Sequence, residues 1–550
     1  MSELSHGDFG KREQHFTTLL PLRANRYNTE ALVKLAQAMK GDVDIVKDGP
    51  DPEENILVPA GYTYFGQFID HDLTFDSTSS LDFTSGATPT NLRTPRFDLD
   101  CVYGDGPDAQ PFMYDGAKLL FRDGPKLSPT DLAEKDLLRN SLGRAIIGDK
   151  RNDENSIVSQ IQLSFLKYHN AVVDVLKLKN EKTWNTPHKL FESARNEVRW
   201  TYQQLIVKDF LPRIVLKDVL ANLNVKGIAE RAKNYALYAE DKRSNLPREF
   251  VAAAYRFGHS GVRTGYRMNA ELKSRFSIFP ASNDRTTTAG ADSLLGFDPI
   301  TENQVIDNWE RFFPNTPPGV LPTEDRTAAA SETPDGSIRL QFAYKIDPTL
   351  VDPLSVLPRA EVAGEGTAQE AEATIAPCKL PDTEIFPPRP SLALLNLLRG
   401  DSYRIQSGQA FARALQERGL PCKVLDHKYL ATRQPVKGKK GLFKFVPIPP
   451  ELQNETPLWF YILAEAQAPL VDHFGHKEFD EVELLNGVGA KTQLGWVGGR
   501  IVAEVFYGLL DCDAESYVNA APEGWKPMLG DDKAQVIFRS MLKFADASNS

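Results

Sequence analysis

The chain has 550 residues and a mass of 61.3 kDa, with 41% hydrophobic, 10% aromatic and 25% charged residues. These values are ordinary for globular proteins, and they exclude a disordered, collagen-like or coiled-coil chain. The formal net charge is −10, so we expect no nucleic acid partner. The four cysteines form no CxxC pair, which indicates neither a disulfide framework nor a cysteine-based zinc site.

The sequence carries no pattern of export or membrane insertion. Charged residues interrupt every apolar stretch near the N-terminus, so no secretory signal is predicted. A membrane span needs about 18 consecutive apolar residues, and no such run occurs. These features predict a soluble, cytoplasmic protein and leave non-classical export open. The oligomeric state cannot be read from them.

The first part of the chain predicts little regular structure. Residues 1–56 are expected to form an N-terminal arm with one helix over 28–39, where apolar residues recur at helical spacing. Residues 57–150 are interrupted by Gly, Pro and Asp, which predicts loops around short helices. We expect one large domain over 57–550.

The rest of the chain predicts long helices around a loop-rich insertion. Pro212 is expected to end the second of these helices, because proline cannot continue one. Residues 280–385 are rich in Pro, Ala and Thr and predict surface loops. The fold class is therefore mainly α. The helices are expected over 155–179, 187–210, 248–257, 392–415, 459–466 and 499–510.

The segment PAGYTYFGQFIDHDLTFD, residues 59–76, is the richest in chemistry. On a helix Gln67 and His71 share one face, whereas Asp70 and Asp72 point to either side. One turn thus presents an imidazole, an amide and two carboxylates. The simpler interpretation is a buried, hydrogen-bonded histidine at the end of a helix.

The next segment, residues 94–100, alternates oxygen-bearing side chains. Thr94, Asp98 and Asp100 can turn oxygens to one side of a loop, and Arg96 can add its carbonyl. Asp72 of the preceding helix can supply another carboxylate. Such a set suits Ca²⁺, which takes about six to eight oxygen ligands. The alternative is a solvated acidic loop.

Two further segments carry single residues of interest. Arg151 lies in GDKRNDE, residues 148–154, and His259 ends YRFGH, residues 255–259. An arginine beside a histidine can stabilise developing negative charge, and a second histidine can bind a metal from the opposite side. The alternatives are a surface charge at a helix start and a histidine favoured at a helix end.

Together these segments resemble the animal-type haem peroxidases of the peroxidase-cyclooxygenase superfamily. The resemblance runs from about residue 57 to 415. It implies a large, single-domain helical haem peroxidase fold with little β structure. The segments that carry it are GQFIDHD at 66–72, TPRFDLDCVYG at 94–104, GDKRNDE, YRFGH and LNLLR at 395–399.

The resemblance implies a role for each matching residue. His259 would be the axial haem-iron ligand, with Asn396 accepting a hydrogen bond from its other ring nitrogen. His71 would act on H₂O₂ as base and then acid, and Arg151 would stabilise charge on the departing oxygen. Gln67 would position water or a small anion. A ferryl haem intermediate would then oxidise small donors such as phenols, halides or thiocyanate, in a response to oxidative stress.

The resemblance also implies how the cofactors are held. Asp70 and Glu154 match the carboxylates that form ester bonds to haem b in the family, and Arg256 and Arg399 would pair with its propionates. Asn155 stands where some relatives carry a methionine, so no sulfonium bond is expected. The TPRFDLD segment matches the family's calcium loop.

Three alternatives remain at this point. One is a catalytically weak haem- and calcium-binding module of the same fold. Another is a fatty-acid oxygenase of the same superfamily. Arg256 argues against this alternative, because those enzymes carry a radical-forming tyrosine at that position. The third is an HD-type metal phosphohydrolase built on His71 and Asp72 with His169 and Asp174.

Overall fold

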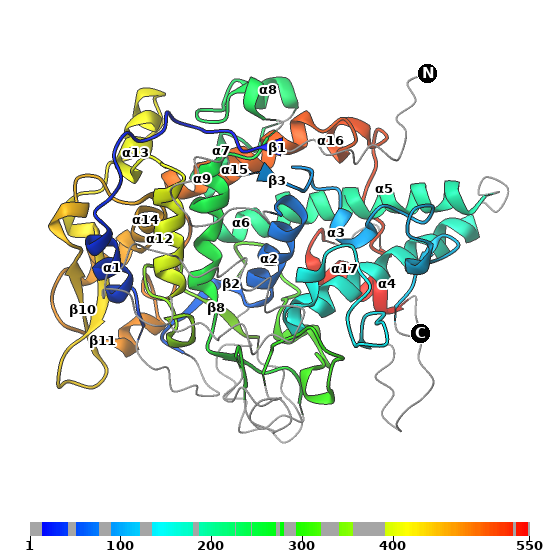
Figure 1. Ribbon diagram of the computed structural model, residues 1–550, viewed down its shortest axis with the longest axis horizontal. Coiled ribbons are helices and arrows are strands. Elements are labelled where there is room, and N and C mark those ends of the chain that lie inside the picture. Colours follow the sequence, from blue (N-terminus) through cyan, green and yellow to red (C-terminus); the bar gives the residue numbers. More distant parts are fainter. Residues whose placement is uncertain are drawn as a thin grey trace.

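The computed structural model describes residues 14–41, 51–75, 90–121, 135–179, 186–225, 227–243, 245–270, 275–279, 293–320, 340–355, 391–531 and 535–547. Within these residues the fold is mainly α-helical, with few and short strands, as the sequence predicts. The longer helices gather around a shared hydrophobic core, and other segments wrap over them (Figure 1).

The helices differ widely in length. The longer ones are α1 (Thr29–Ala38), α2 (Gly61–Leu73), α4 (Ser156–Lys179), α5 (Pro187–Leu205), α12 (Leu392–Ser402), α13 (Gly408–Glu417), α14 (Leu458–Phe474), α15 (Trp496–Cys512) and α17 (Phe538–Ala547). The shorter ones are α3 (Asp100–Tyr103), α6 (Leu211–Ile214), α7 (Lys217–Ala221), α8 (Ile228–Ala232), α9 (Arg248–Ala252) and α16 (Tyr517–Ala520). No helix of the described residues is long and apolar enough to cross a lipid bilayer.

The strands form small antiparallel sheets. The largest has the order β11-β10-β9 and lies at one end of the molecule (Figure 1). Its strands are β9 (Ala431–Pro435), β10 (Leu442–Pro447) and β11 (Phe479–Asp480). The two-stranded sheets pair β1 (Gln14–His15) with β3 (Thr90–Asn91), β2 (Glu54–Pro59) with β8 (Phe342–Tyr344), β4 (Tyr114–Asp115) with β5 (Lys118–Leu119), and β6 (Gly265–Tyr266) with β7 (Phe276–Ser277).

Several predicted helices are confirmed nearly to the residue. The helix predicted over 28–39 is α1, and the Asn28 side chain caps it by accepting a hydrogen bond from the Ala31 N–H at 3.0 Å. The helix predicted over 155–179 is α4, where the Asn155 side chain accepts from the Val158 N–H at 2.9 Å. The helices predicted over 459–466 and 499–510 lie inside α14 and α15.

Two predictions about where helices end or continue are wrong. Pro212 does not stop the helix after α5. The chain continues through a π-helical turn, Ile206–Phe210, into α6, and Pro212 sits in the first turn of α6, where no N–H is needed. The single helix predicted over 392–415 is two helices, because Arg404 between them adopts a left-handed φ of 56° and Ser407 caps α13.

The predicted insertion at 280–385 is only partly described. Where residues 293–320 and 340–355 are described, they contain buried core side chains and the strand β8, which pairs with β2. This part is therefore not a surface loop, because Phe312, Phe313 and Phe342 are fully buried. The Ala- and Thr-rich stretches 327–336 and 363–376 lie outside the described residues.

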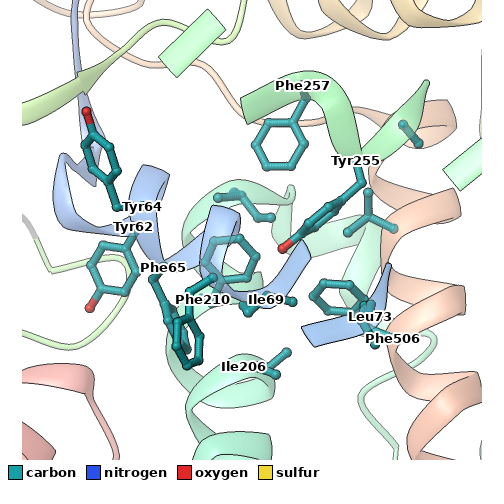
Figure 2. Packing of buried hydrophobic residues seen from close by; sticks show 14 of the residues in the cluster. Tyr62, Tyr64, Phe65, Ile69, Leu73, Ile206, Phe210, Tyr255, Phe257 and Phe506 are labelled. Atoms are coloured by element: carbon teal, nitrogen blue, oxygen red, sulfur yellow. The ribbon is translucent and has the colours of Figure 1, made fainter. Parts of the chain in front are cut away.

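Aromatic packing fixes the position of α2 in the core. Phe68 of α2 stacks on Phe165 of α4, with ring centroids 4.8 Å apart. Phe65, one turn earlier, meets Phe210 edge to face at 5.8 Å, and Figure 2 shows these two rings together below the helix. Such pairs contribute about 0.5–1.5 kcal/mol beyond the area they bury. The opposite face of α2 is therefore the one left for polar residues.

Candidate active site

The polar face of α2 carries His71, which is 4% exposed. Its Nδ1 lies 2.8 Å from Oδ1 of Asn152, and its Nε2 lies 3.7 Å from Oε1 of Glu154. Gln67, one turn earlier, donates to Glu154 through its Nε2 and accepts from Nδ2 of Asn155 at 3.1 Å. The predicted neighbours Gln67, His71 and Glu154 are thus brought together, and Nε2 of His71 faces them.

Arg151 lies beside the end of α2, on the 3₁₀ turn η3 (Lys150–Asp153). Its Nη2 donates to the backbone carbonyls of His71, at 3.0 Å, and of Thr74, and to Asp149 Oδ2 at 2.7 Å. The guanidinium also lies 4.8 Å from the Phe75 ring centroid. The structure therefore holds the positive charge next to His71, as the sequence predicts.

The surroundings perturb the ionisation of the groups on this side. Burial and the charge of Arg151 lower the pKa of His71 to about 3. Burial raises the pKa of Glu154 to about 7, although the charge of Arg151 acts in the opposite direction. Burial also raises the pKa of Asp70, which is influenced by both Arg151 and Arg256. The charges of both arginines act against this rise.

The second histidine, His259, lies on the 3₁₀ helix η6 (Ala254–Gly261), which follows α9. The helix predicted over 248–257 is therefore broken at Ala253. His259 Nδ1 lies 2.8 Å from Nδ2 of Asn396 on α12, so the predicted pair does meet. Burial and the charge of Arg256 lower the pKa of His259 to about 3.

The orientation of the Asn396 amide differs from the expected one. We expected its oxygen to accept a hydrogen bond from His259. In the structure Nη1 of Arg256 donates to that oxygen at 3.1 Å, and the amide nitrogen faces the imidazole. The reason is that a guanidinium can only donate, so the oxygen turns toward Arg256. Arg399 follows Asn396 on α12 and contacts the Tyr403 ring.

The segments that carry the two histidines are in direct contact. The Tyr255 hydroxyl donates to the Gly66 carbonyl of α2 at 3.1 Å, and Figure 2 shows its oxygen pointing at that helix. The Thr63 hydroxyl donates to the Gly261 carbonyl at 3.5 Å. These bonds tie η6 to α2 at both of its ends.

The residues between the histidines fit a haem. Among the described residues Nε2 of His259 has no hydrogen-bond partner, and a Cβ added at the neighbouring Gly258 would meet no atom within 4 Å. The polar side chains around this space are partly accessible although their elements belong to the core. They are Gln67, Asp70, Glu154, Arg256, His259 and Arg399. Two imidazoles, two carboxyls and two guanidiniums suit an iron porphyrin with its propionates.

Three carboxylates meet on the other side of His71. One oxygen each of Asp72, Asp98 and Asp100 lies within 4.8 Å of the others. Within the part of the chain that the structure describes, neither oxygen of the fully buried Asp72 has a hydrogen-bond partner, and burial with the two neighbouring carboxylates raises its pKa. Burial and Asp98 raise the pKa of Asp100 to about 7. Unpartnered buried oxygens of one charge fit a cation.

The loop of this cluster has a strained backbone. Leu99, between Asp98 and Asp100, has a left-handed φ of 60°, which is rare for a branched residue. Thr94 donates its hydroxyl to Asp98 Oδ2 at 2.8 Å, as its place in the predicted set suggests. The Arg96 side chain lies 3.7 Å from Asp513, away from the cluster. Only its carbonyl could serve there.

Two residues next to the site, Asn152 and Gln162, were not predicted from the sequence. Both are fully buried, and Asn152 Nδ2 donates to Gln162 Oε1 at 2.8 Å. The signal for Gln162 was an amide on the apolar face of a long helix, since buried polar residues are uncommon. For Asn152 the sequence contains no pattern that indicates a role, apart from its position directly after Arg151.

The phosphohydrolase alternative fails on His169. Its Nδ1 lies 3.1 Å from the Tyr103 hydroxyl and its Nε2 lies 2.8 Å from the Ala117 carbonyl, so both ring nitrogens are engaged. Asp174, the other required ligand, pairs with Lys118 at 2.7 Å. The fully buried His169 is a packed, hydrogen-bonded residue, as its position on the core face predicts.

Comparison with known proteins shows a similarity to haem peroxidases over part of the chain. The animal haem peroxidase model matches residues 82–301, which contain Arg151, Glu154, His259 and the acidic loop. The fold is that of peroxidase A from Dictyostelium discoideum, with a TM-score of 0.56 at 13% identity over 98% of this chain and 96% of that one. Residues 82–301 are thus similar to the animal haem peroxidases, and the chain shares the fold of a peroxidase.

The proteins that match this chain in sequence are distant relatives. A peroxidase-like protein of Margaritifera margaritifera is 25% identical over 288 residues, which are 40% of this chain and 36% of the relative. A dual oxidase of Drosophila melanogaster is 25% identical over 127 residues, or 23% of this chain and 7% of the relative. The chain thus matches slightly more than a third of the length of the first relative and a small part of the second.

Proposed function

We propose that this protein is a haem peroxidase that uses H₂O₂ to oxidise small donors such as phenols, halides or thiocyanate. The observation that carries the proposal is the pair of histidines, the buried His71 on α2 and the partly buried His259 on η6, each with Nδ1 held by an asparagine amide. This arrangement leaves Nε2 of each ring for other chemistry.

Haem b would be bound at this space by residues of four segments. His259 is the proposed iron ligand through Nε2, which requires the proton on Nδ1 and the Asn396 oxygen toward the ring. Arg256 and Arg399 are the proposed partners of the propionates. If a propionate binds the guanidinium of Arg256, that guanidinium no longer donates to the Asn396 oxygen. The oxygen can then accept a hydrogen bond from His259. When bound, the haem supplies the redox chemistry that no side chain can.

His71 and Arg151 are the proposed catalytic residues. The lone pair on His71 Nε2 takes a proton from one peroxide oxygen and returns it to the departing oxygen, as general base and then general acid. The charge of Arg151, held beside His71 by two backbone carbonyls, stabilises the negative charge on that departing oxygen. Gln67, bonded to Glu154, would place a water or a small anion near Nε2.

The carboxyl groups have proposed roles on either side of α2. Asp70 and Glu154 would form ester bonds to haem methyl groups, because both are partly accessible and Glu154 Oε1 lies 3.7 Å from His71 Nε2. Each ester would replace a C–H bond of the methyl group, with H₂O₂ taking up the two electrons. The mass of the denatured chain after peroxide treatment measures this directly. Asp72, Asp98 and Asp100 would bind Ca²⁺, with Thr94 and the Arg96 carbonyl completing the set.

The proposed function is tested by loading the full chain with haem and mixing it with H₂O₂ and a phenol or halide. We expect a Soret absorption band and steady turnover. His71→Ala and Arg151→Ala should each lower kcat by about a hundredfold or more, because each removes a group that acts on the transition state. Turnover by either variant at the wild-type rate would refute the assignment.

A matched control separates catalysis from folding. His169→Ala removes a histidine that is also buried and doubly hydrogen-bonded but lies on α4, packed against Tyr103. We expect this variant to lose stability and, at a temperature where it is folded, to keep its turnover per haem. A loss as large as that of His71→Ala would indicate a general structural effect instead.

A further inference from the structure

A line of buried hydrogen bonds runs from His71 into the core. His71 Nδ1 lies 2.8 Å from Asn152 Oδ1, and Asn152 Nδ2 donates to Gln162 Oε1 at 2.8 Å. Gln162 Nε2 in turn donates to the backbone carbonyl of Cys101 at 3.5 Å. Asn152 and Gln162 are fully buried, so water does not compete for these bonds. The line crosses from α2 through η3 and α4 to α3.

The Cys101 carbonyl, the last member of the line, determines which group donates and which accepts in each of these hydrogen bonds. A backbone carbonyl can only accept, so Gln162 must give its NH₂ to Cys101 and turn its oxygen to Asn152. Asn152 must then give its own NH₂ to Gln162 and turn its oxygen to His71. The reverse order would set the Gln162 oxygen against the Cys101 carbonyl and leave buried groups unsatisfied.

The anchor of the line is itself held in place. The Cys101 carbonyl also accepts a hydrogen bond from the Asp149 N–H at 3.1 Å, and Cys101 lies inside the short helix α3. A Cβ added at Gly148 would lie 2.8 Å from that same oxygen, so the two backbones are in close contact. The carbonyl therefore has little freedom to turn away from Gln162.

We infer that Gln162 is a positioning residue that, through Asn152, fixes the tautomer of His71. The proton is held on Nδ1, and the lone pair is held on Nε2, which lies 3.7 Å from Glu154 Oε1. This inference rests on the proposed function, in which that lone pair accepts a proton from peroxide. Gln162 itself touches neither the haem space nor His71.

The test replaces Gln162 and reads the tautomer by nuclear magnetic resonance. The full chain is labelled with ¹⁵N-histidine, loaded with haem, reduced and bound to carbon monoxide, which makes the iron diamagnetic. The signals of His71 are those that vanish in His71→Gln. In the wild type we expect one species, with the proton on Nδ1. Gln162→Met should give a mixture of both tautomers, because Asn152 can then turn either end to the ring.

Two further variants separate this role from packing. Gln160→Met is the control, since Gln160 is also a buried amide of α4, bonded to the carbonyls of Ser156 and Gln304. It should lower stability and leave the His71 signals unchanged. Gln162→Glu should restore the single tautomer, because a protonated carboxyl offers the same acceptor and donor as the amide. Peroxide should react about fivefold or more slowly with Gln162→Met than with Gln160→Met.

The outcomes distinguish this inference from the proposed function. A single Nδ1–H tautomer in Gln162→Met would overturn the inference even if the wild type is an active peroxidase. A wild-type chain that takes up no haem or does not react with peroxide would refute the proposed function. The tautomer can then be read in the same labelled chain without haem, where a mixture in Gln162→Met alone supports the inference.

Discussion

At the residue scale, the acidic cluster beside His71 carries negative charges that few neighbouring groups compensate. The carboxylates of the buried Asp72 and the partly buried Asp98 and Asp100 lie within reach of one another. Among their ion pairs in the described residues only Asp100 has a cationic neighbour, Arg93 at 2.9 Å. Burial raises the pKa of all three carboxyls, and the neighbouring carboxylate charges raise those of Asp72 and Asp100 further. A divalent cation removes the repulsion between these charges, so we expect it to stabilise the fold.

Removal of calcium should therefore lower the thermal unfolding midpoint. With free Ca²⁺ at a hundred times its Kd, binding adds about 2.7 kcal/mol, and a chelator should remove this amount. Asp98→Asn should be less stable in Ca²⁺ and should no longer respond to the chelator. Asp218→Asn, at an exposed position of α7, is the control and should respond as the wild type does. Equal midpoints with and without Ca²⁺ would argue against the site.

At the element scale, the close approach of two backbones joins the acidic loop to the arginine turn. A Cβ added at Gly148 would lie 2.4 Å from the Asp100 carbonyl oxygen, closer than real atoms come. Arg93 reinforces the contact, since its Nη2 donates to the Gly148 carbonyl at 3.1 Å and to Asp149 Oδ2 at 2.6 Å. The turn that carries Arg151 is thus seated on the loop that carries Asp98 and Asp100.

Gly148→Ala should separate these two elements. Because the obstructing atoms belong to the backbone, the methyl group must move one segment, and we expect a loss of about 1–3 kcal/mol in denaturant unfolding. Calcium affinity should fall as well. Gly400→Ala is the control, since a Cβ there meets nothing within 4 Å in helix α12, and it should be neutral or slightly stabilising. If Gly148→Ala behaves like the control, the contact is not needed.

At the scale of the whole molecule, a buried ion pair links the strand β2 to the segment after His259. Arg263 is fully buried, and its Nη1 donates to Glu54 Oε1 of β2 at 3.1 Å and to the Phe342 carbonyl of β8 at 2.7 Å. Three segments far apart in the chain meet at this one guanidinium. The position of η6, and with it His259, depends on how well these partners satisfy the charge.

Arg263→Met should cost about 3–5 kcal/mol in the free energy of unfolding, because it leaves Glu54 buried without its partner. The double variant with Glu54→Gln should lose less than the two single losses combined. Lys34→Met is the comparison, since its pair with Glu30 is exposed on both sides, and it should change stability little. Strict additivity of the Arg263 and Glu54 losses would show that the pair is not coupled.

Local patterns predicted the helices and the types of group in the site. The spacing of apolar residues was enough for α1 and α4, and the spacing within GQFIDHD placed Gln67 and His71 on one face, because neighbouring turns of a helix decide both. The helix ends at Pro212 and near Arg404 were wrong, since a proline in a first turn and a left-handed residue depend on what packs around them.

The sequence by itself determined the mainly α fold and the imidazoles, carboxylates and guanidiniums that the site contains. Only the tertiary structure decided how they are oriented. His71 meets Asn152 across 81 residues, and His259 meets Asn396 across 137 residues. The orientation of each asparagine amide depends on a third group, Gln162 or Arg256. A hydrogen bond has a donor and an acceptor end, and only the assembled network decides which end faces which group.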